Sequence, residues 1–165
     1  AGHVAGAVSF ELTHQGKSVF FTGDLLFNDL RTLDGAQLPR RPVDLLVMET
    51  TRGGAERPAG QQREGEIARL LEDIRKALSR GGSVLIPVFA LGRMQEMLVV
   101  LDEARKNKVL PPTPVFCSGL GMDLVNHIHQ ISQNFNRVHF KRKVLLFLGI
   151  SLCVTVFSIM LRRME

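Results

Sequence analysis

Three ionisable side chains stand where predicted strands of this 165-residue chain begin or end. His3 precedes the first strand, Asp24 follows the second, and Glu49 follows the third. Active sites of α/β proteins usually lie at strand ends. One imidazole and two carboxylates match the groups that bind divalent metals or act in general acid–base catalysis. Spacing alone also allows a structural interpretation, in which the three residues belong to a frayed terminus and two turns.

Short apolar segments separated by turns predict the strands that would position these residues. We expect one strand over residues 4–12 and a second over residues 18–22, joined by a hairpin turn. Residues 25–42 have the composition of a loop. The nearly continuous apolar run over residues 43–48 is typical of a strand buried on both faces.

The middle of the chain predicts alternating helices and strands. Apolar residues at helical spacing predict a helix over residues 62–80, stopped by two glycines. Residues 83–89 predict a strand, and Pro87 implies a sheet edge or a strand end. A second helix is expected after Arg93. This alternation predicts an α/β fold whose first two strands form a hairpin.

A further strand and helix are expected before residue 140. Residues 115–117 predict a short strand, and residues 122–133 predict a helix. The spacing places four apolar residues on the inward face of that helix: Leu124, Val125, Ile128 and Ile131.

The net charge of +5 does not by itself indicate a nucleic-acid-binding protein. Residues 1–140 carry 16 Lys and Arg against 15 Asp and Glu, so the basic excess lies in the last 25 residues. The two cysteines cannot form a disulfide framework, so we expect a reducing, cytoplasmic location. Any nucleic-acid role must therefore come from local geometry.

Four motifs occur in a recognisable order. They are AGHVAGA at residues 1–7, FTGD at 21–24, METTRGG at 48–54 and VLIPVFALGRMQE at 84–96. Together they resemble the β-CASP branch of the metallo-β-lactamase fold, a branch that includes RNA-processing nucleases. The resemblance covers roughly residues 1–140.

The resemblance implies a two-zinc hydrolase core. His3 would ligate one metal, Asp24 would bridge both, and Glu49 would orient a histidine further along the chain. A bridging carboxylate holds two cations about 3.5–4 Å apart for hydrolysis. Arg93 and Gly92 at a helix start would meet a phosphate of the nucleic acid, although a solvated arginine is an equal alternative. Arg52 would be a further substrate contact.

Several features depart from the family pattern. The His-x-His-x-Asp-His run expected before Ala1 is absent, and no histidine follows His139. The family's Thr-Tyr-Gly is Thr51-Arg52-Gly53 here, so Arg52 stands where the family has a tyrosine. We therefore expect a partial αββα metallo-β-lactamase-like core over residues 1–60, a partial β-CASP-like domain over residues 61–140 and an apolar tail over residues 141–165.

These expectations describe a fragment of a zinc-dependent RNA-processing nuclease that, as an isolated chain, binds zinc weakly and cleaves nothing. The alternative is a non-catalytic remnant of the fold tethered to a membrane. A hydrolase of small esters or lactams fits the later motifs less well. DNA as the substrate and a homo-oligomeric state stay open. Part of a sheet sandwich would leave apolar faces uncovered and favour aggregation.

Residues 144–161 carry no charge over 18 positions. As a helix they would span about 27 Å, just short of a hydrocarbon core of about 30 Å. A membrane helix, foreign sequence after a truncation or frameshift, and two buried strands are the alternatives.

Overall fold

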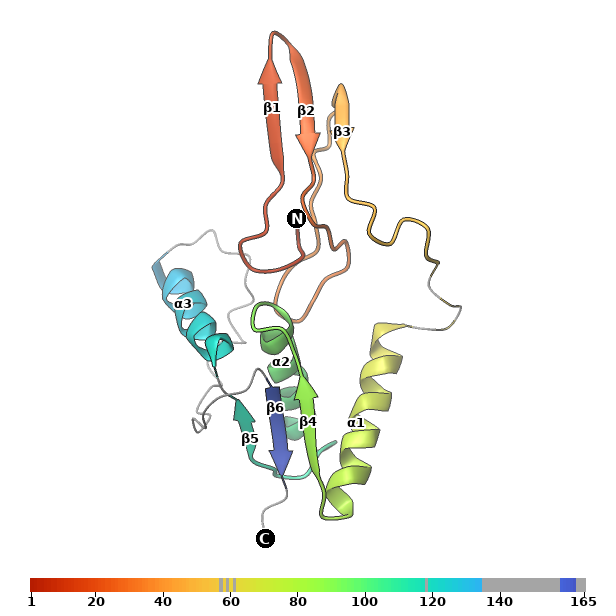
Figure 1. The fold of residues 1–165 in the computed structure, drawn as a ribbon, viewed down its shortest axis with the longest axis vertical. Helices are drawn as coiled ribbons and strands as arrows, with labels where there is room; N and C mark the ends of the chain where they lie inside the picture. Colours follow the sequence, from red (N-terminus) through yellow and green to blue (C-terminus); the bar gives the residue numbers. More distant parts are fainter. Residues whose placement is uncertain (57, 59, 61, 118, 135–157, 163–165) are drawn as a thin grey trace.

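The part of the chain that the structure describes forms two three-stranded sheets at opposite ends of an elongated molecule, with the helices around the second sheet (Figure 1). This computed structural model describes residues 1–56, 58, 60, 62–117, 119–134 and 158–162. The mixed α/β architecture confirms the class predicted from the alternation of helices and strands.

The first sheet contains the predicted hairpin. Strands β1 (Phe10–His14) and β2 (Lys17–Phe21) are antiparallel, and β3 (Leu45–Val47) lies parallel to β2. The hairpin turns at Gln15 and Gly16, both of which have positive φ angles. The strand expected over residues 4–12 begins only at Phe10, because Gly6 turns the chain with φ of 88°.

One face of this sheet is apolar and largely exposed. Phe10 is 62% exposed, Leu12 61% and Leu45 55%. The expectation that the third strand is buried on both faces was wrong, because β3 lies at the sheet edge and all three of its residues are exposed. The pairing register places six apolar residues on this face: Phe10, Leu12, Val19, Phe21, Leu45 and Val47.

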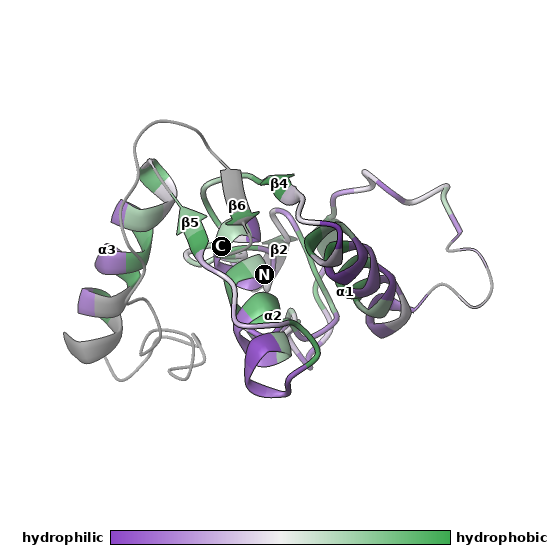
Figure 2. Ribbon diagram, turned by 90° about the horizontal axis from the view of Figure 1, so that it is seen from below, coloured by the Kyte–Doolittle hydropathy of each residue, from purple (hydrophilic) through white to green (hydrophobic). Residues whose placement is uncertain are grey.

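The second sheet has the order β4-β6-β5, and both pairings are antiparallel. Its strands are β4 (Ser83–Pro87), β5 (Val115–Cys117) and β6 (Ser158–Arg162). Pro87 lies at the end of an edge strand, as predicted. Hydrophobic residues of the sheet and of α2 lie together, whereas α1 carries a strongly hydrophilic side (Figure 2). The main core comprises Ile74, Leu78, Met94, Leu98, Leu101, Ala104, Leu110, Cys117 and Leu161.

Three helices follow the predicted periodicity. Helix α1 (Arg63–Ser79) ends before Gly81, whose φ of 76° stops the helix. Helix α2 (Arg93–Lys106) begins directly after Gly92, and α3 is Leu120–Asn134. Ile131 is 47% exposed, so its predicted inward position was wrong. Ile128, one turn earlier, is buried.

The segment over residues 144–161, for which a membrane helix was one of three alternatives, lies mostly outside the described residues. Its described end, from Ser158, belongs to strand β6 and not to a helix. Within the described ranges, no helix is long and apolar enough to cross a membrane.

A smaller apolar cluster ties the loop after β2 to the helices. Leu30 and Leu33 pack with Ile128 of α3, and Val99 of α2 packs against the same cluster. Since this loop begins directly after Asp24, the cluster helps to fix the segment that carries a predicted metal ligand.

Candidate functional site

The structure places His3 beside Asp24. Gly2 forms an isolated antiparallel bridge with Leu25. In an antiparallel pair, the residue after Gly2, which is His3, lies opposite the residue before Leu25, which is Asp24. The Leu26 amide donates to the Ala1 carbonyl at 3.1 Å and extends this contact. Two residues 21 positions apart in the sequence are therefore neighbours on adjoining segments.

Glu49 brings a third segment to the same place. Its Oε1 accepts a hydrogen bond from the Leu25 amide at 2.8 Å, and its Oε2 accepts one from the Thr51 amide at 3.3 Å. The hydrogen bond from Leu25 is the largest cause that lowers the pKa of Glu49 below its usual value, and the charge of His3 lowers it further. The ionised carboxylate therefore holds the backbone next to Asp24.

The loop between β4 and α2 approaches the same region. Gly92 has φ of 82°, and a Cβ at this position would lie 2.7 Å from Val4 Cγ1. Only glycine fits this close approach without strain. Because Val4 follows His3, the contact sets the start of α2 against the segment that carries the imidazole. Arg93, the first residue of α2, is exposed, and its guanidinium contacts no carboxylate among the described residues.

Gln95 fixes the backbone around Arg93. Its Oε1 accepts from the Gly92 amide at 2.7 Å, and its Nε2 donates to the carbonyls of Ala90 at 3.0 Å and Gly121 at 3.1 Å. The side chain is 2% exposed. These three hydrogen bonds hold the turn before α2 and connect it to the start of α3.

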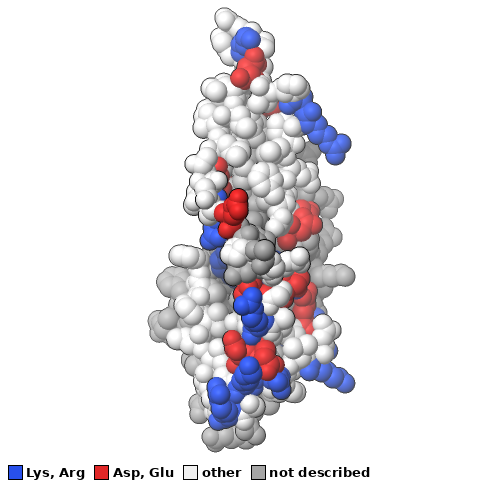
Figure 3. Space-filling view, turned by 90° about the vertical axis from the view of Figure 1, so that its right-hand side faces the viewer, with Lys and Arg blue, Asp and Glu red and all other residues white. Residues whose placement is uncertain are grey.

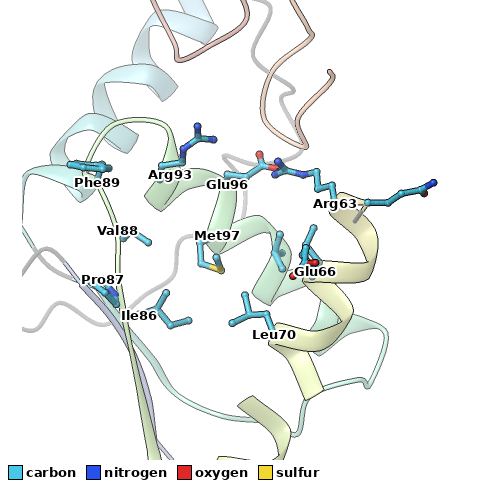
Figure 4. Close-up of a pocket in the computed structure, with 13 residues that line it drawn as sticks. Arg63, Glu66, Leu70, Ile86, Pro87, Val88, Phe89, Arg93, Glu96 and Met97 are labelled. Carbon is cyan, nitrogen blue, oxygen red and sulfur yellow. The ribbon is translucent and has the colours of Figure 1, made fainter. Parts of the chain in front are cut away.

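Glu96 connects α2 to the loop that follows Asp24. Its carboxylate accepts hydrogen bonds from the amides of Arg31 and Thr32, each at 3.0 Å, and from the Thr32 hydroxyl at 2.8 Å. The guanidinium of Arg63 on α1 points at the same carboxylate and pairs with it (Figure 4). At 5% exposure, Glu96 is a buried anion satisfied by four donors from two segments.

Arg31 extends this connection to both helices. Its guanidinium donates two hydrogen bonds to Glu64 of α1, at 2.9 and 3.2 Å, and one to Glu103 of α2 at 2.7 Å. These hydrogen bonds to Glu64 are the largest cause that raises the pKa of Arg31 above its usual value. The guanidinium thus clamps the loop onto α1 and α2.

Sequence reasoning missed Gln95 and Glu96 as residues that organise this region. Both are buried polar side chains in a helix whose neighbouring positions are apolar. At 3.6 residues per turn, Glu96 lies nearly opposite the stripe of Met94, Met97, Leu98 and Leu101, with Val99 and Val100 as its neighbours. The apolar residues on that second face were the available signal, since a polar group buried among them must find partners elsewhere in the fold.

The remaining predicted residues are less closely associated. Arg52 is exposed in the turn after Glu49, where the Ala55 amide bonds to its backbone carbonyl at 3.1 Å. Among the described residues, no three His, Cys, Asp or Glu side chains form a group that could hold one metal ion. The backbone therefore brings together the segments that carry His3, Asp24 and Glu49, but the three side chains do not form a set of ligands for one metal ion.

Surface charge gives no broad basic face on the side shown in Figure 3, where acidic and basic side chains alternate. Ion pairs occur along α1, such as Arg75 with Glu72 and Arg69 with Glu66. This agrees with the near-neutral balance of residues 1–140.

Comparison with known proteins finds clear relatives, although no family model matches the chain. It is 41% identical over 107 residues to endoribonuclease YSH1 of Kluyveromyces lactis, which covers 65% of this chain and 14% of that protein. It is 35% identical over 153 residues to endoribonuclease ysh1 of Schizosaccharomyces pombe, covering 89% of this chain and 20% of the relative. The Aspergillus fumigatus endoribonuclease ysh1 is 44% identical over 104 residues, or 62% of this chain and 12% of that relative. The chain thus spans a fifth or less of the length of these curated relatives.

Proposed function

We propose that this chain belongs to the β-CASP branch of the metallo-β-lactamase fold and forms part of the catalytic region of an RNA-processing endoribonuclease. The similarity to proteins named endoribonuclease supports RNA as the substrate. The observation that carries the assignment to particular residues is the meeting of His3, Asp24 and Glu49 from three separate segments.

In this proposal, His3 and Asp24 bind zinc. An imidazole nitrogen and a carboxylate oxygen are both common zinc ligands, so the residues fit the metal in kind. Bound zinc would supply a hydroxide nucleophile and neutralise charge on the phosphodiester. Glu49 holds the Leu25 amide and thereby fixes the backbone from which the Asp24 side chain projects.

Arg93 would bind a phosphate of the RNA. The Arg93 side chain is exposed, and Gly92 lets the backbone at the start of α2 lie against Val4, the residue after His3. An arginine fork suits phosphate oxygens. Arg52, beyond Glu49, would make a second and more peripheral phosphate contact.

The isolated chain would bind zinc weakly and would not cleave RNA. Zinc sites need three or four protein ligands for tight binding, and this proposal assigns two. The same proposal divides the chain into a metallo-β-lactamase-like part over residues 1–60 and a β-CASP-like part over residues 61–140.

Titration with zinc, followed by nuclear magnetic resonance, tests the metal assignment. We expect weak binding that shifts the ring signals of His3 and the amides flanking Asp24. His3→Ala should abolish the shift, whereas His14→Ala, at the exposed end of β1, should leave it intact. Equal loss in both variants would contradict the proposed ligand set.

Fluorescence anisotropy with single-stranded RNA tests the phosphate contact. Arg93→Ala should weaken binding and lower the dependence of log K on log salt by about one unit. The matched control is Arg80→Ala, at the far end of α1. If the control weakens binding as much as Arg93→Ala does, the contact is non-specific.

A further inference from the structure

An open pocket of about 640 Å³ lies between α1, the end of β4 and the first turns of α2 (Figure 4). Its volume falls within the range of about 300–1,000 Å³ that is usual for small-ligand sites. Ile67 and Leu70 of α1, Ile86 and Val88 at the β4 side, and Met97 of α2 provide apolar walls. The pocket could therefore receive a flat, largely apolar group.

The rim of the pocket is polar and carries one uncompensated positive charge. Arg63 is paired with Glu96, and Glu66 is paired with Arg69. Arg93 also lines the pocket, and among the described residues it has no acidic partner. A ligand that complements this arrangement has an apolar body and an anionic group beside it.

The pocket adjoins the candidate metal site through the start of α2. Gly92 contacts Val4, the residue after His3, and Arg93 is the next residue along. A strand of RNA that passes His3 and Asp24 would therefore meet Arg93 and then the pocket.

We propose that this pocket binds one base of the RNA, with the adjoining phosphate on Arg93. This inference rests on the proposed function and deepens it. The base packs against Ile67, Leu70 and Met97, while Gln62 at the rim offers a side-chain amide for hydrogen bonds to the base edge. The phosphate supplies the anion that Arg93 lacks.

Anisotropy titrations with two probes test this assignment: oligouridylate, and an abasic ribose-phosphate oligomer of the same length and charge. The unmodified chain should bind oligouridylate about tenfold more tightly, since a buried base contributes on this scale. Ile67→Trp, which fills the pocket, should bring this ratio close to one. Leu85→Trp is the matched control because Leu85 is 63% exposed and does not line the pocket.

A second variant protects the test against misfolding. Ile67→Glu places a carboxylate in the pocket and should also remove the preference for oligouridylate, with circular dichroism confirming that both variants fold. Arg93→Ala should weaken binding of both probes by a similar factor and leave their ratio intact.

The possible failures are distinguishable. Equal binding of both probes to the unmodified chain would overturn the base pocket while leaving RNA binding in place. A ratio unchanged in both folded Ile67 variants would do the same and would assign the pocket to protein packing. Binding of neither probe would overturn the proposed function, and the base pocket with it.

Discussion

Replacement of Glu96 should remove the hydrogen bonds that hold the loop containing Arg31 and Thr32 against α2. In Glu96→Ala, Thr32, which is 1% exposed, loses the acceptor for both its amide and its hydroxyl. Each buried donor left unsatisfied costs about 1–3 kcal/mol. Arg63, whose side chain is 38% exposed, regains water and adds little. We therefore expect a loss of about 3–5 kcal/mol, as for other broken buried pairs.

Glu96→Gln keeps one acceptor oxygen and should cost roughly half as much, about 1.5–3 kcal/mol. Glu103→Gln is the matched control. Glu103 accepts one hydrogen bond from Arg31, its side chain is 48% exposed, and its loss should cost no more than about 1 kcal/mol.

Urea unfolding followed by circular dichroism measures these differences as shifts of the midpoint at constant slope. Hydrogen exchange at the amides of Arg31 and Thr32 reports the loop directly, and it should accelerate in the Glu96 variants before global unfolding. A Glu96→Ala chain as stable as the unmodified one, or a Glu103→Gln chain equally destabilised, would refute the assigned role of Glu96.

Three further changes have defined outcomes. Because the folded-state pKa of Glu49 is lowered, its carboxylate stabilises the fold above its usual value of 4.5, and this contribution disappears as the pH falls through the lowered pKa. Glu49→Gln should flatten this part of the urea-midpoint profile, and an unchanged profile would contradict it. Gly92→Ala should lower the free energy of unfolding by about 1–3 kcal/mol, measured by calorimetry. Gly54→Ala is the control, because Gly54 has open space around it and the substitution should change stability little. Equal effects of the two substitutions would refute the steric argument. After zinc loading and dialysis, elemental analysis should find well below one zinc per chain, and stoichiometric retention would overturn the two-ligand assignment.

Local sequence signals predicted the helices well because helix formation follows a single repeating spacing. The apolar stripe ending at Leu78 gave α1 to within one residue at each end, and the glycine at position 81 marked its stop. The same reasoning failed for residues 43–48, because burial depends on what covers a strand and not on its apolar content alone. The turn at Gly6 likewise removed the first half of a strand that composition favoured.

The neighbouring positions of His3 and Asp24 followed from motif order, which carries information about a whole fold. The role of Glu96 could not be predicted from motif order. Its partner Thr32 lies 64 positions earlier, in a loop with no periodic pattern. A buried acid inside a helix indicates that a partner exists, but only the tertiary structure identifies it.

The position of β6 has a consequence for how the molecule assembles. This strand is the middle one of its sheet, yet it is formed by residues 158–162, near the carboxyl end of the chain. During synthesis on a ribosome, β4 and β5 emerge first and have no strand between them. The buried Leu161 reaches them only after residues 118–157 have also been synthesised. The β4-β6-β5 sheet should therefore be completed late in folding. Until then its exposed apolar residues would be available for binding by a chaperone.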